Sequence, residues 1–579
     1  MTSFSVESVP LRDEQLEIWS RANPRAANWP VVYTLTGGSS VYVGESLNML
    51  GRAKQHRASP EKRGLETAHV VVDETFNKSA CLDLESFLIR LFSGDGAFQV
   101  LNRNDGVIDA DYYRRGDYQT TFAAVFDELR ALGLFSRSIP QIENSDLFKL
   151  SPFKALTQEQ AIAVEDILEG VFEDLGTDAT STSVVRGAPG TGKTVVAIFL
   201  VKLLVDIAAG RELEEASSDS LFSDFFAPGY GEVLEGIRIG LVIPQQSLRK
   251  SVENVFKKTP GLDPSMVLTP FQVGSSPEQF DLLIVDEAHR LSIRASQASG
   301  FQNRDFKRIT ESLFGSDDVS KTQLDWIRRK SRHQVLLLDE AQAIRPGDLP
   351  LETTTALVEE AGMAGRLYPL TSQMRIRSDE DYVGYVRAAL NGNGTPRGFA
   401  GYDLRFFDDF GTMRSEILAR DDEHGLARLV AGYAWPWNSQ TDKAAFDVVI
   451  DGIELQWNQR IVDWISSPTS RDEVGSIHTV QGYDLNYAGV IIGPDVGVDP
   501  SSGNVVFRRE KYFDKRGKRN NPTLGITYSD EDLLKLVINI YVVLLTRGIR
   551  GTYVYVVDPL LRDRLRPFFD RAHVSTAAS

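Results

Sequence analysis

The feature that most constrains the fold is a glycine-rich segment between two apolar runs. Gly187-Ala-Pro-Gly-Thr-Gly-Lys-Thr194 fits the pattern G-x-x-x-x-G-K-[ST]. It follows a β-branched run that begins at Ser183, and it opens an apolar segment, 194–208, that is typical of a buried helix. A strand, a glycine-rich turn and a helix in this order surround a phosphate with backbone N–H groups at a helix N-terminus. The segment therefore predicts a phosphate-binding loop.

Further apolar runs of strand length follow the same pattern. Three of them end at turns in the same half of the chain, at 239–243, 282–285 and 335–338. A second set lies at 448–450, 489–492 and 552–557. Continuous apolar strands that alternate with helices are typical of parallel sheets covered on both faces. The chain is therefore predicted to be an α/β protein with two doubly wound parallel-sheet domains in tandem.

Composition sets outer limits on function. A length of 579 residues allows three or four domains at roughly 100–200 residues each. The net charge of −17, from 63 basic and 80 acidic residues, argues against a generally basic nucleic-acid coat. The single cysteine, Cys81, excludes an intramolecular disulfide and a cage of several cysteines around a metal.

No membrane segment or leader is expected. The N-terminus has neither a basic region nor an apolar core of the kind found in signal peptides. The most apolar long window, 195–209, is interrupted by Lys202 and Asp206 and falls short of the roughly 20 apolar residues of a membrane helix. We therefore expect a cytoplasmic protein without a membrane partner.

Two acidic residues complete a nucleotide site. Asp286 and Glu287 stand at the end of the apolar run 282–285. Asp286 is predicted to contact Mg²⁺ together with Thr194, and Glu287 to act as a base or to position water. Lys193 would reach the β- and γ-phosphates, while the loop backbone surrounds them at Gly187, Pro189, Gly190, Thr191 and Gly192. A structural acidic turn is the alternative, but the two motifs together predict NTP hydrolysis.

Residues 156–558 resemble the motor of superfamily 1 helicases. The resemblance rests on six further motifs in family order: Leu156-Thr-Gln-Glu-Gln160, Ile243-Pro-Gln-Gln-Ser-Leu, Leu338-Asp-Glu-Ala-Gln342, Gln373-Met-Arg375, Ser476-Ile-His-Thr-Val-Gln-Gly-Tyr-Asp484 and Val543-Leu-Leu-Thr-Arg547-Gly. The chain departs from the family at Leu338, where the family has glycine. The resemblance implies two RecA-like domains, which we place at 153–345 and 346–579.

The same resemblance implies roles for the motif residues. Gln160 would contact the adenine of ATP, the strand-end motif at 243–248 would touch the nucleic-acid strand, and Gln342 would couple the nucleotide to the nucleic acid. Arg375 and Arg547 would reach the γ-phosphate when the two domains close on ATP, which completes the charge around Lys193. Either arginine alone would ordinarily be a surface or salt-bridge residue.

Within this superfamily the chain resembles bacterial helicase-like proteins related to the helicase part of Schlafen proteins. Thr322-Gln-Leu-Asp, before the 335–338 strand, and Tyr541-Val-Val-Leu-Leu-Thr-Arg-Gly-Ile-Arg-Gly551 carry this resemblance. It does not imply directional unwinding, because such a motor can also serve as a translocase or as an ATP-driven sensor.

The N-terminal segment 28–105 carries a second set of motifs. A hairpin is predicted at 31–35 and 41–43, followed by helices at 47–56 and 81–92. Its polar positions are Tyr33 in Val31-Val-Tyr33, Tyr42 in Tyr42-Val-Gly44, then Arg52, His56, Glu85 and Asn102. This order resembles the GIY-YIG nuclease module. Val31-Val32 replaces Gly-Ile, a mild departure because the tyrosine carries the chemistry.

The nuclease resemblance implies hydrolysis of a phosphodiester with one metal ion, usually Mg²⁺, with Mn²⁺ as an alternative. Glu85 would be the metal-binding carboxylate and Arg52 the phosphate clamp. Tyr33 would act as general base or water positioner, with Tyr42 and His56 as hydrogen-bonding support. Strand tyrosines are more often packing residues, so a degenerate nuclease kept as a nucleic-acid clamp is the main alternative.

The expected organisation is a small α+β nuclease-like domain at 1–135, a linker at 136–152 and the two motor domains. The second motor domain contains a basic segment, 507–519, with seven basic and two acidic residues. It can contact a phosphate backbone while Tyr512 or Phe513 stacks on a base, or it can be a solvated loop.

Together these patterns predict an ATP-dependent nucleic-acid-processing enzyme, a helicase or translocase motor coupled to an endonuclease. Anti-phage defence, favoured over DNA repair, is the expected setting, and DNA is favoured over RNA. A second copy of the chain or a partner protein from a defence system is a further candidate partner. The alternative function is an ATP-driven sensor or translocase whose N-terminal module binds without cutting. Because the net charge is −17, the nucleic-acid contacts are expected to be positive grooves on an otherwise acidic surface.

Overall fold

The computed structural model describes residues 4–23, 25, 28–102, 112–152, 156–177, 179–210, 222–294, 300–371, 381–460, 464–465, 467–480 and 483–570. The chain divides into two compact units. The first unit comprises residues 1–157, 202–235 and 252–264, and the second comprises 158–201, 236–251 and 265–579. The domain boundaries predicted from the sequence stay a prediction.

A five-stranded sheet forms the centre of the first unit. Its order is β1 (Phe4–Pro10), β4 (Thr67–Asp73), β2 (Val31–Gly37), β3 (Ser40–Ser46) and β5 (Gln99–Val100). The predicted hairpin is confirmed as β2 and β3, which pair antiparallel with Tyr33 opposite Gly44. A Cβ at Gly44 would lie 2.4 Å from the Tyr33 hydroxyl, so glycine lets the tyrosine ring cross the neighbouring strand. Strand β1 has no long apolar run and was not predicted.

The two helices predicted at 47–56 and 81–92 are confirmed, with shifted ends, as α2 (Met49–Ala58) and α3 (Lys78–Asp95). The unit also contains α1 (Asp13–Ala22), which was not predicted, and α4 (Arg115–Ala131). Two short helices, α5 (Ile139–Glu143) and α6 (Asp146–Lys149), lie in the segment 136–152 that was expected to be a linker. The side chains of Asn48 and Asn77 accept hydrogen bonds from the first turns of α2 and α3, which sets where these helices begin. Leu84 and Leu88 of α3 pack on the sheet in the core of the unit.

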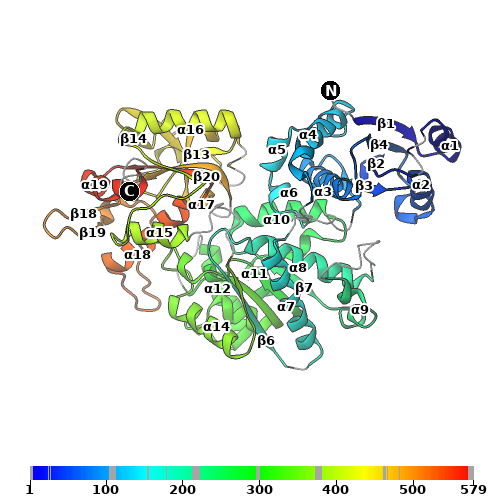
Figure 1. Cartoon of the computed structure of the whole chain (residues 1–579). Coiled ribbons are helices and arrows are strands. Elements are labelled where there is room, and N and C mark those ends of the chain that lie inside the picture. The colour runs from blue at the N-terminus through cyan, green and yellow to red at the C-terminus, as the bar shows by residue number, and fades with distance from the viewer. Residues whose placement is uncertain are drawn as a thin grey trace. The chain divides into compact units, whose positions relative to one another are not determined.

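A six-stranded parallel sheet lies in the second unit (Figure 1). Its order is β11 (Leu367–Leu370), β6 (Ser181–Gly187), β10 (Ser331–Leu338), β9 (Phe280–Val285), β7 (Ile239–Val242) and β8 (Val267–Leu268). These strands confirm the four predicted apolar runs of this half of the chain. Strand β11 pairs with β6 although it follows residue 345 in the sequence. All strands run parallel, so their carboxyl ends meet at one edge.

The second unit also contains a seven-stranded sheet and a two-stranded sheet of β18 (Val496–Val498) and β19 (Val505–Phe507). The order of the seven-stranded sheet is β12 (Asp403–Phe406), β20 (Gly548–Val556), β17 (Leu485–Ile492), β13 (Ala427–Ala431), β16 (Glu473–Ser476), β15 (Ile453–Trp457) and β14 (Val448–Ile450). The expectation of an entirely parallel sheet is wrong at this edge, because β14 pairs antiparallel with β15. Asp451 and Gly452, both with positive φ, form the tight turn that reverses the chain there.

The longest apolar segment of the sequence is a helix of the α/β fold. Helix α8 (Lys193–Ala208) follows β6, and Lys202 and Asp206 form an ion pair along it. Across the described parts of the chain, no helix is both long enough and apolar enough to cross a membrane.

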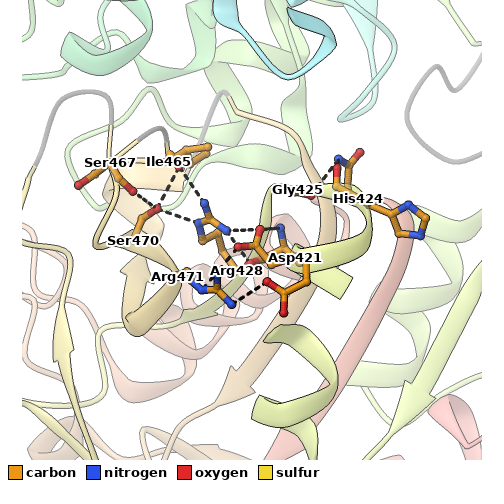
Figure 2. A network of polar contacts seen from close by, with 11 residues as sticks. Asp421, His424, Gly425, Arg428, Ile465, Ser467, Ser470 and Arg471 are labelled. Atoms are coloured by element: carbon orange, nitrogen blue, oxygen red, sulfur yellow. Dashed lines mark hydrogen bonds and ion pairs between the residues drawn. The ribbon is translucent and has the colours of Figure 1, made fainter. Parts of the chain in front are cut away.

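A buried arginine fastens the segment before β16 (Figure 2). Arg428 of β13 donates to Asp421 of α16 (Phe410–His424) at 2.5 Å and to the Ser470 hydroxyl at 2.8 Å. It also donates to the Ala427 carbonyl at 2.9 Å and to the Ile465 carbonyl at 3.3 Å. Ser470 also donates to the Ile465 and Ser467 carbonyls. One guanidinium thus holds a helix end and an irregular segment together.

Replacing Arg428 with methionine is expected to lower the free energy of unfolding by about 3–5 kcal/mol, because the buried Asp421 carboxylate loses its partner. Denaturant unfolding followed by circular dichroism measures this loss. Arg328→Met is the control, because Arg328 pairs with Glu360 at the surface and its loss should cost below about 1 kcal/mol. Equal, small losses in both variants would contradict this account of Arg428.

Candidate functional site

The phosphate loop joins β6 to α8 at the carboxyl edge of the six-stranded sheet. Gly190 and Gly192 have φ of 88° and 82°, a region that L side chains rarely adopt. A Cβ at Gly187 would lie 2.4 Å from the Thr191 hydroxyl. The three glycines therefore allow the loop to fold tightly against the start of α8, with Pro189 between them.

Two side chains are bonded to this loop from inside. The Lys193 ammonium donates to the carbonyls of Gly187 at 2.6 Å and Ala188 at 3.0 Å. The Gln160 amide, on α7 (Gln158–Leu175), donates to the Thr191 carbonyl at 2.8 Å. Both side chains are buried. Gln160 therefore lies next to the loop that the sequence assigns to the phosphates.

The acidic pair lies beside the start of α8. The Thr194 hydroxyl donates to Asp286 at 2.7 Å, and the backbone N–H of Glu287 donates to the other Asp286 oxygen at 2.9 Å. Burial and the neighbouring Glu287 raise the pKa of Asp286 to about 6. A hydroxyl and a carboxylate oxygen are ligands that Mg²⁺ prefers. Thr194 and Asp286 therefore fit the predicted magnesium site.

Glu287 combines a strained backbone with a buried carboxylate oxygen. Its φ of 51° is unusual for a residue other than glycine. Although burial alone would raise the pKa of Glu287, the neighbouring His289 and Lys193 hold it well below its usual range. Its Oε2 lies 3.2 Å from His289 Nε2, and neither atom makes a hydrogen bond to the residues that the structure describes. An ionised carboxylate with a spare buried oxygen can orient a water molecule.

The remaining predicted motor residues lie at the ends of other elements. Gln342 donates to Asp339 at 2.7 Å, just after β10. Arg547 follows α18 (Asp530–Leu545), is buried, and donates to the Tyr483 carbonyl at 3.2 Å. Arg375 lies outside the described residues. The structure thus brings Lys193, Thr194, Asp286 and Glu287 together, while the roles of Gln342, Arg375 and Arg547 stay predictions.

A groove of about 590 Å³ in the second unit is lined by residues that follow strands of both the six-stranded and the seven-stranded sheet. Its charge is mainly positive, with Asp348 as the acid within the described lining. Two aromatic side chains, Phe271 and Trp437, also line it. The basic residues of the lining are Arg249, Arg290, Arg345, Arg516 and Arg519. Cations and aromatic faces in one groove are the features with which proteins hold a single nucleic-acid strand.

Parts of this groove were predicted from motifs. Gln245, Gln246 and Ser247 line it, and they belong to the motif assigned to nucleic-acid contact. Trp437 and Asn458 were missed, because neither stands in a recognisable motif. Trp437 lies between β13 and β14, and Asn458 follows β15. This position beside strands was the only sequence signal that could have indicated a site.

The basic segment 507–519 contributes less positive charge to the groove than its composition suggests. Arg508 pairs with Asp558 at 2.6 Å, and Arg509 pairs with Asp530 at 2.7 Å. Lys518 donates to backbone carbonyls of the same segment. Of its seven basic residues, Arg516 and Arg519 line the groove.

The expectation that Tyr512 can stack on a base is wrong. Its ring is 1% exposed and lies 5.4 Å from the Phe507 ring in the core. A Cβ at Gly517 would lie 2.3 Å from the Tyr512 hydroxyl, so the turn closes over this side chain. Phe513, the other predicted stacking residue, is half-buried.

The predicted nuclease residues of the first unit form a compact cluster. Tyr33 comes from β2, Tyr42 from β3, and Arg52 and His56 from α2. The Tyr33 hydroxyl lies 2.7 Å from His56 Nε2. Lys62, which was not predicted, donates to His56 Nδ1 at 3.1 Å, and its ammonium lies 3.7 Å from the centre of the Tyr42 ring.

These contacts fix the protonation of His56. An ammonium group only donates, so His56 Nδ1 accepts and the imidazole proton lies on Nε2, where it is donated to Tyr33. Burial, with the charges of Lys62 and Arg52, lowers the pKa of His56 to about 3. Burial also raises the pKa of Tyr33 well above its usual value, with Tyr42 adding to the effect. Both groups are therefore neutral at physiological pH.

Glu85 lies on α3 near a second carboxylate. Burial and Glu45 of β3 raise the pKa of Glu85 to about 8, against the opposing charges of Lys78 and Arg52. Glu45 pairs with Lys78 through one oxygen, and its Oε2 is buried without a hydrogen bond to any described residue. No group of three or more acidic, histidine or cysteine side chains suited to a metal occurs in the described ranges. The role of Glu85 as a metal ligand stays a prediction.

Asn102 has a structural role in this unit. Its amide donates to the Val43 carbonyl at 2.7 Å, and its carbonyl accepts from the Val43 N–H at 2.9 Å. The side chain thus pairs with β3 as another strand would.

Comparison with known proteins places most of the second unit in a family. A family model described as "Schlafen group 3, DNA/RNA helicase domain" matches residues 180–558. The "Uncharacterized protein YPL245W" of Saccharomyces cerevisiae is 27% identical over 414 residues, which cover 66% of this chain and 83% of the yeast protein.

Two solved structures are similar at lower levels. The arterivirus nonstructural protein 10 (helicase) in complex with DNA has a TM-score of 0.25 and 11% identity, over 69% of this chain and 65% of the viral chain, just under two thirds. The Pif1 helicase from Bacteroides in complex with ADP-AlF3 and ssDNA has a TM-score of 0.24 and 11% identity, over 71% of this chain and 94% of that chain. With TM-scores this low, neither likeness contributes to the assignment. The family match spans well over half of the chain, which therefore belongs to the Schlafen group 3 DNA/RNA helicase domain family.

Proposed function

We propose that this protein is an ATP-dependent nucleic-acid motor whose N-terminal module is a metal-dependent endonuclease of the GIY-YIG type. Membership of a helicase domain family supports an NTP-hydrolysing enzyme. The main observation in support of the motor function is that four predicted residues lie together at the carboxyl edge of the six-stranded sheet: Lys193, Thr194, Asp286 and Glu287. The arginine-lined groove lies in the same unit.

The nucleotide site supports hydrolysis by positioning and charge. Lys193 would exchange its bonds to the loop carbonyls for the β- and γ-phosphates. Thr194 and Asp286 would hold Mg²⁺, which neutralises charge on the phosphates when bound. Glu287 would orient the attacking water through Oε2, which makes no hydrogen bond to the described residues. Arg375 and Arg547 are proposed to complete the charge around the γ-phosphate, and Gln160 to contact the adenine.

The groove supports binding of a nucleic-acid strand, for which DNA is favoured over RNA. Its arginines are suited to phosphates, and Trp437 or Phe271 offers a face for a base. Arg516 and Arg519 are proposed as phosphate contacts because they line the groove. By contrast, Arg508 and Arg509 of the same segment form ion pairs with acidic residues elsewhere in the unit.

Replacing Arg516 and Arg519 together with alanine is expected to weaken binding of oligothymidylate and to lower the slope of log affinity against log salt by about 1–2. Each phosphate contact releases counterions from the nucleic acid on binding, so the loss of a contact makes the affinity depend less on salt. Fluorescence anisotropy at several salt concentrations measures the slope. Lys515→Ala is the matched control, because Lys515 is exposed in the same segment and does not line the groove. An unchanged slope in the double variant would contradict the assignment.

The nuclease proposal rests on the contact of Tyr33 with His56 and on the approach of Arg52 to the same tyrosine. Because the pKa of Tyr33 is raised, we favour Tyr33 as the group that positions water rather than as the base. Arg52 would bind the scissile phosphate. Glu85 would hold a divalent ion, which when bound activates water and offsets charge on the reacting phosphate.

One observation favours the alternative function of the N-terminal module. Tyr33 is fully buried and packs with Tyr42 in the same apolar cluster as Val31 and Leu35. A module in which this cluster serves only as core would bind nucleic acid without cutting it. The whole chain would then be an ATP-driven sensor or translocase.

A panel of substrates tests the proposed function. ATP hydrolysis and cleavage by the full chain are measured with single-stranded DNA, double-stranded DNA and RNA, in Mg²⁺ and in Mn²⁺. We expect hydrolysis that nucleic acid stimulates and cleavage that requires a divalent ion. Stimulation without cleavage of any substrate would favour the sensor or translocase. Defence against phage, or DNA repair, is the proposed setting of a cutting enzyme.

A further inference from the structure

A pair of hydrogen bonds joins the groove to a carboxylate outside its lining. His478, on α17 (Ile477–Val480), lines the groove. Arg345 Nη2 lies 2.8 Å from His478 Nδ1, and His478 Nε2 lies 2.9 Å from Asp514 Oδ2. A guanidinium only donates, so Nδ1 accepts and the proton of the neutral ring lies on Nε2, where Asp514 accepts it. The two bonds therefore fix one tautomer of His478.

The charges of these groups agree with that tautomer. Burial and the charge of Arg345 lower the pKa of His478. Although burial alone would raise the pKa of Asp514, the hydrogen bond from His478 and the charge of Arg345 hold it well below its usual range. The Asp514 side chain is 10% exposed. A neutral histidine thus bridges a cation and an anion that water screens weakly.

Asp514 also organises the segment that carries the groove arginines. Its Oδ1 accepts the backbone N–H of Arg516 at 2.9 Å, and the preceding residue, Phe513, donates its N–H to the Tyr433 carbonyl at 2.8 Å. The Tyr433 ring in turn lies 5.8 Å from the His478 ring. One carboxylate therefore holds His478 with one oxygen and the backbone of a groove arginine with the other.

Arg345, at the other end of the Arg345–His478–Asp514 contacts, is connected to the nucleotide site. Arg345 follows Gln342 by three residues, and its backbone N–H donates to Asp348 at 3.1 Å. Gln342 donates to Asp339, whose backbone N–H donates to His289 Nδ1 at 3.3 Å. His289 faces Glu287. The ion-pair contact of Glu287 with His289, the hydrogen bonds of His289 and Gln342 with Asp339, and three residues of chain thus connect the nucleotide site with Arg345.

We propose that Asp514 is a positioning residue that makes the grip of Arg516 on a polynucleotide depend on the Arg345–His478 contact, and thereby on the state of the nucleotide site. The proposal rests on the proposed motor function and concerns the regulation of its groove. A shift of the segment after β10 would move Arg345 away from His478. His478 would then release Asp514, and the turn that carries Arg516 would lose its fixed orientation.

Asp514→Ala in the full chain tests the inference. ATP turnover is measured against increasing oligothymidylate, and affinity for the same strand is measured without nucleotide. We expect stimulation of turnover to fall about tenfold, within the usual range of a coupling between two sites. Turnover without nucleic acid and nucleotide-free affinity should each change by no more than about two- to threefold, because the groove arginines remain. Asp514→Asn, which keeps an acceptor, should restore part of the stimulation.

The control is Asp530→Asn, which removes an exposed ion pair with Arg509 near the same segment and should leave stimulation unchanged. His478→Leu removes both hydrogen bonds of the histidine, so the double variant with Asp514→Ala should lose no more than either single variant. If Asp514→Ala proves poorly folded, the loss of stimulation in His478→Leu alone tests the inference.

Two results would overturn the inference. Undiminished stimulation in both Asp514→Ala and His478→Leu removes the coupling role. A loss of nucleotide-free affinity as large as the loss of stimulation makes Asp514 a mere support of the segment. If no polynucleotide stimulates the wild-type protein, the proposed function itself fails, and the inference fails with it.

Discussion

Replacing Lys193 with alanine is expected to lower ATP turnover by about 10²–10³-fold or more, the cost of removing one preorganised charge from a reacting phosphate. The ammonium is buried and already directed into the loop by its bonds to the Gly187 and Ala188 carbonyls. No other lysine lies in the loop, 187–194, so the charge cannot be replaced locally. Steady-state phosphate release measures the effect.

A second variant separates binding from chemistry at this site. Glu287→Gln keeps the shape of the side chain but removes the charge that orients water, so nucleotide affinity should persist while turnover falls as in Lys193→Ala. Fluorescent-nucleotide titration and phosphate release report the two quantities. A Lys193→Ala protein that is folded by circular dichroism and still turns over ATP at the wild-type rate would contradict the assignment of the phosphate loop.

The parts of the fold that the sequence predicted are those with local signals. The phosphate loop could be placed because its glycines, lysine and threonine stand at fixed spacing between a strand and a helix. The parallel strands could be placed because strands buried on both faces are continuously apolar. Strand β1 lacks such a run and owes its place to pairing with β4, which no local pattern encodes.

Side-chain partners were the least predictable part of the sites. Tyr512 stands among basic residues, yet its ring is enclosed by the turn at Gly517 and packs on Phe507. The number of basic residues in the segment did not reveal that Arg508 and Arg509 form ion pairs with Asp558 and Asp530 in the folded protein. Lys62 reaches His56 from six residues along the chain, and only the path after α2 brings it there. Such contacts depend on tertiary geometry and not on spacing.

Glu85→Gln and Tyr33→Phe are each expected to lower metal-dependent cleavage by about 10²–10⁴-fold, the usual range for a lost group that acts on protons or water. The glutamine amide is isosteric with the protonated carboxyl that burial favours at Glu85, so the fold should tolerate this change. Tyr33→Phe keeps the buried ring over Gly44 and removes only the hydroxyl bonded to His56. Its unfolding free energy should fall by about 1 kcal/mol. Gel assays with labelled strands measure cleavage.

Matched variants distinguish a nuclease site from a packed core. Tyr118→Phe removes a hydroxyl that donates to the Thr75 carbonyl at 2.6 Å in the same unit, and Glu128→Gln neutralises an exposed acid of α4. Both should cleave as the wild type does. Lys193→Ala should also keep cleavage if the nuclease is intrinsic to the N-terminal module. Wild-type cleavage by both Glu85→Gln and Tyr33→Phe would place the activity elsewhere. Tyr33, His56 and Glu85 would then be core residues of a module that only binds.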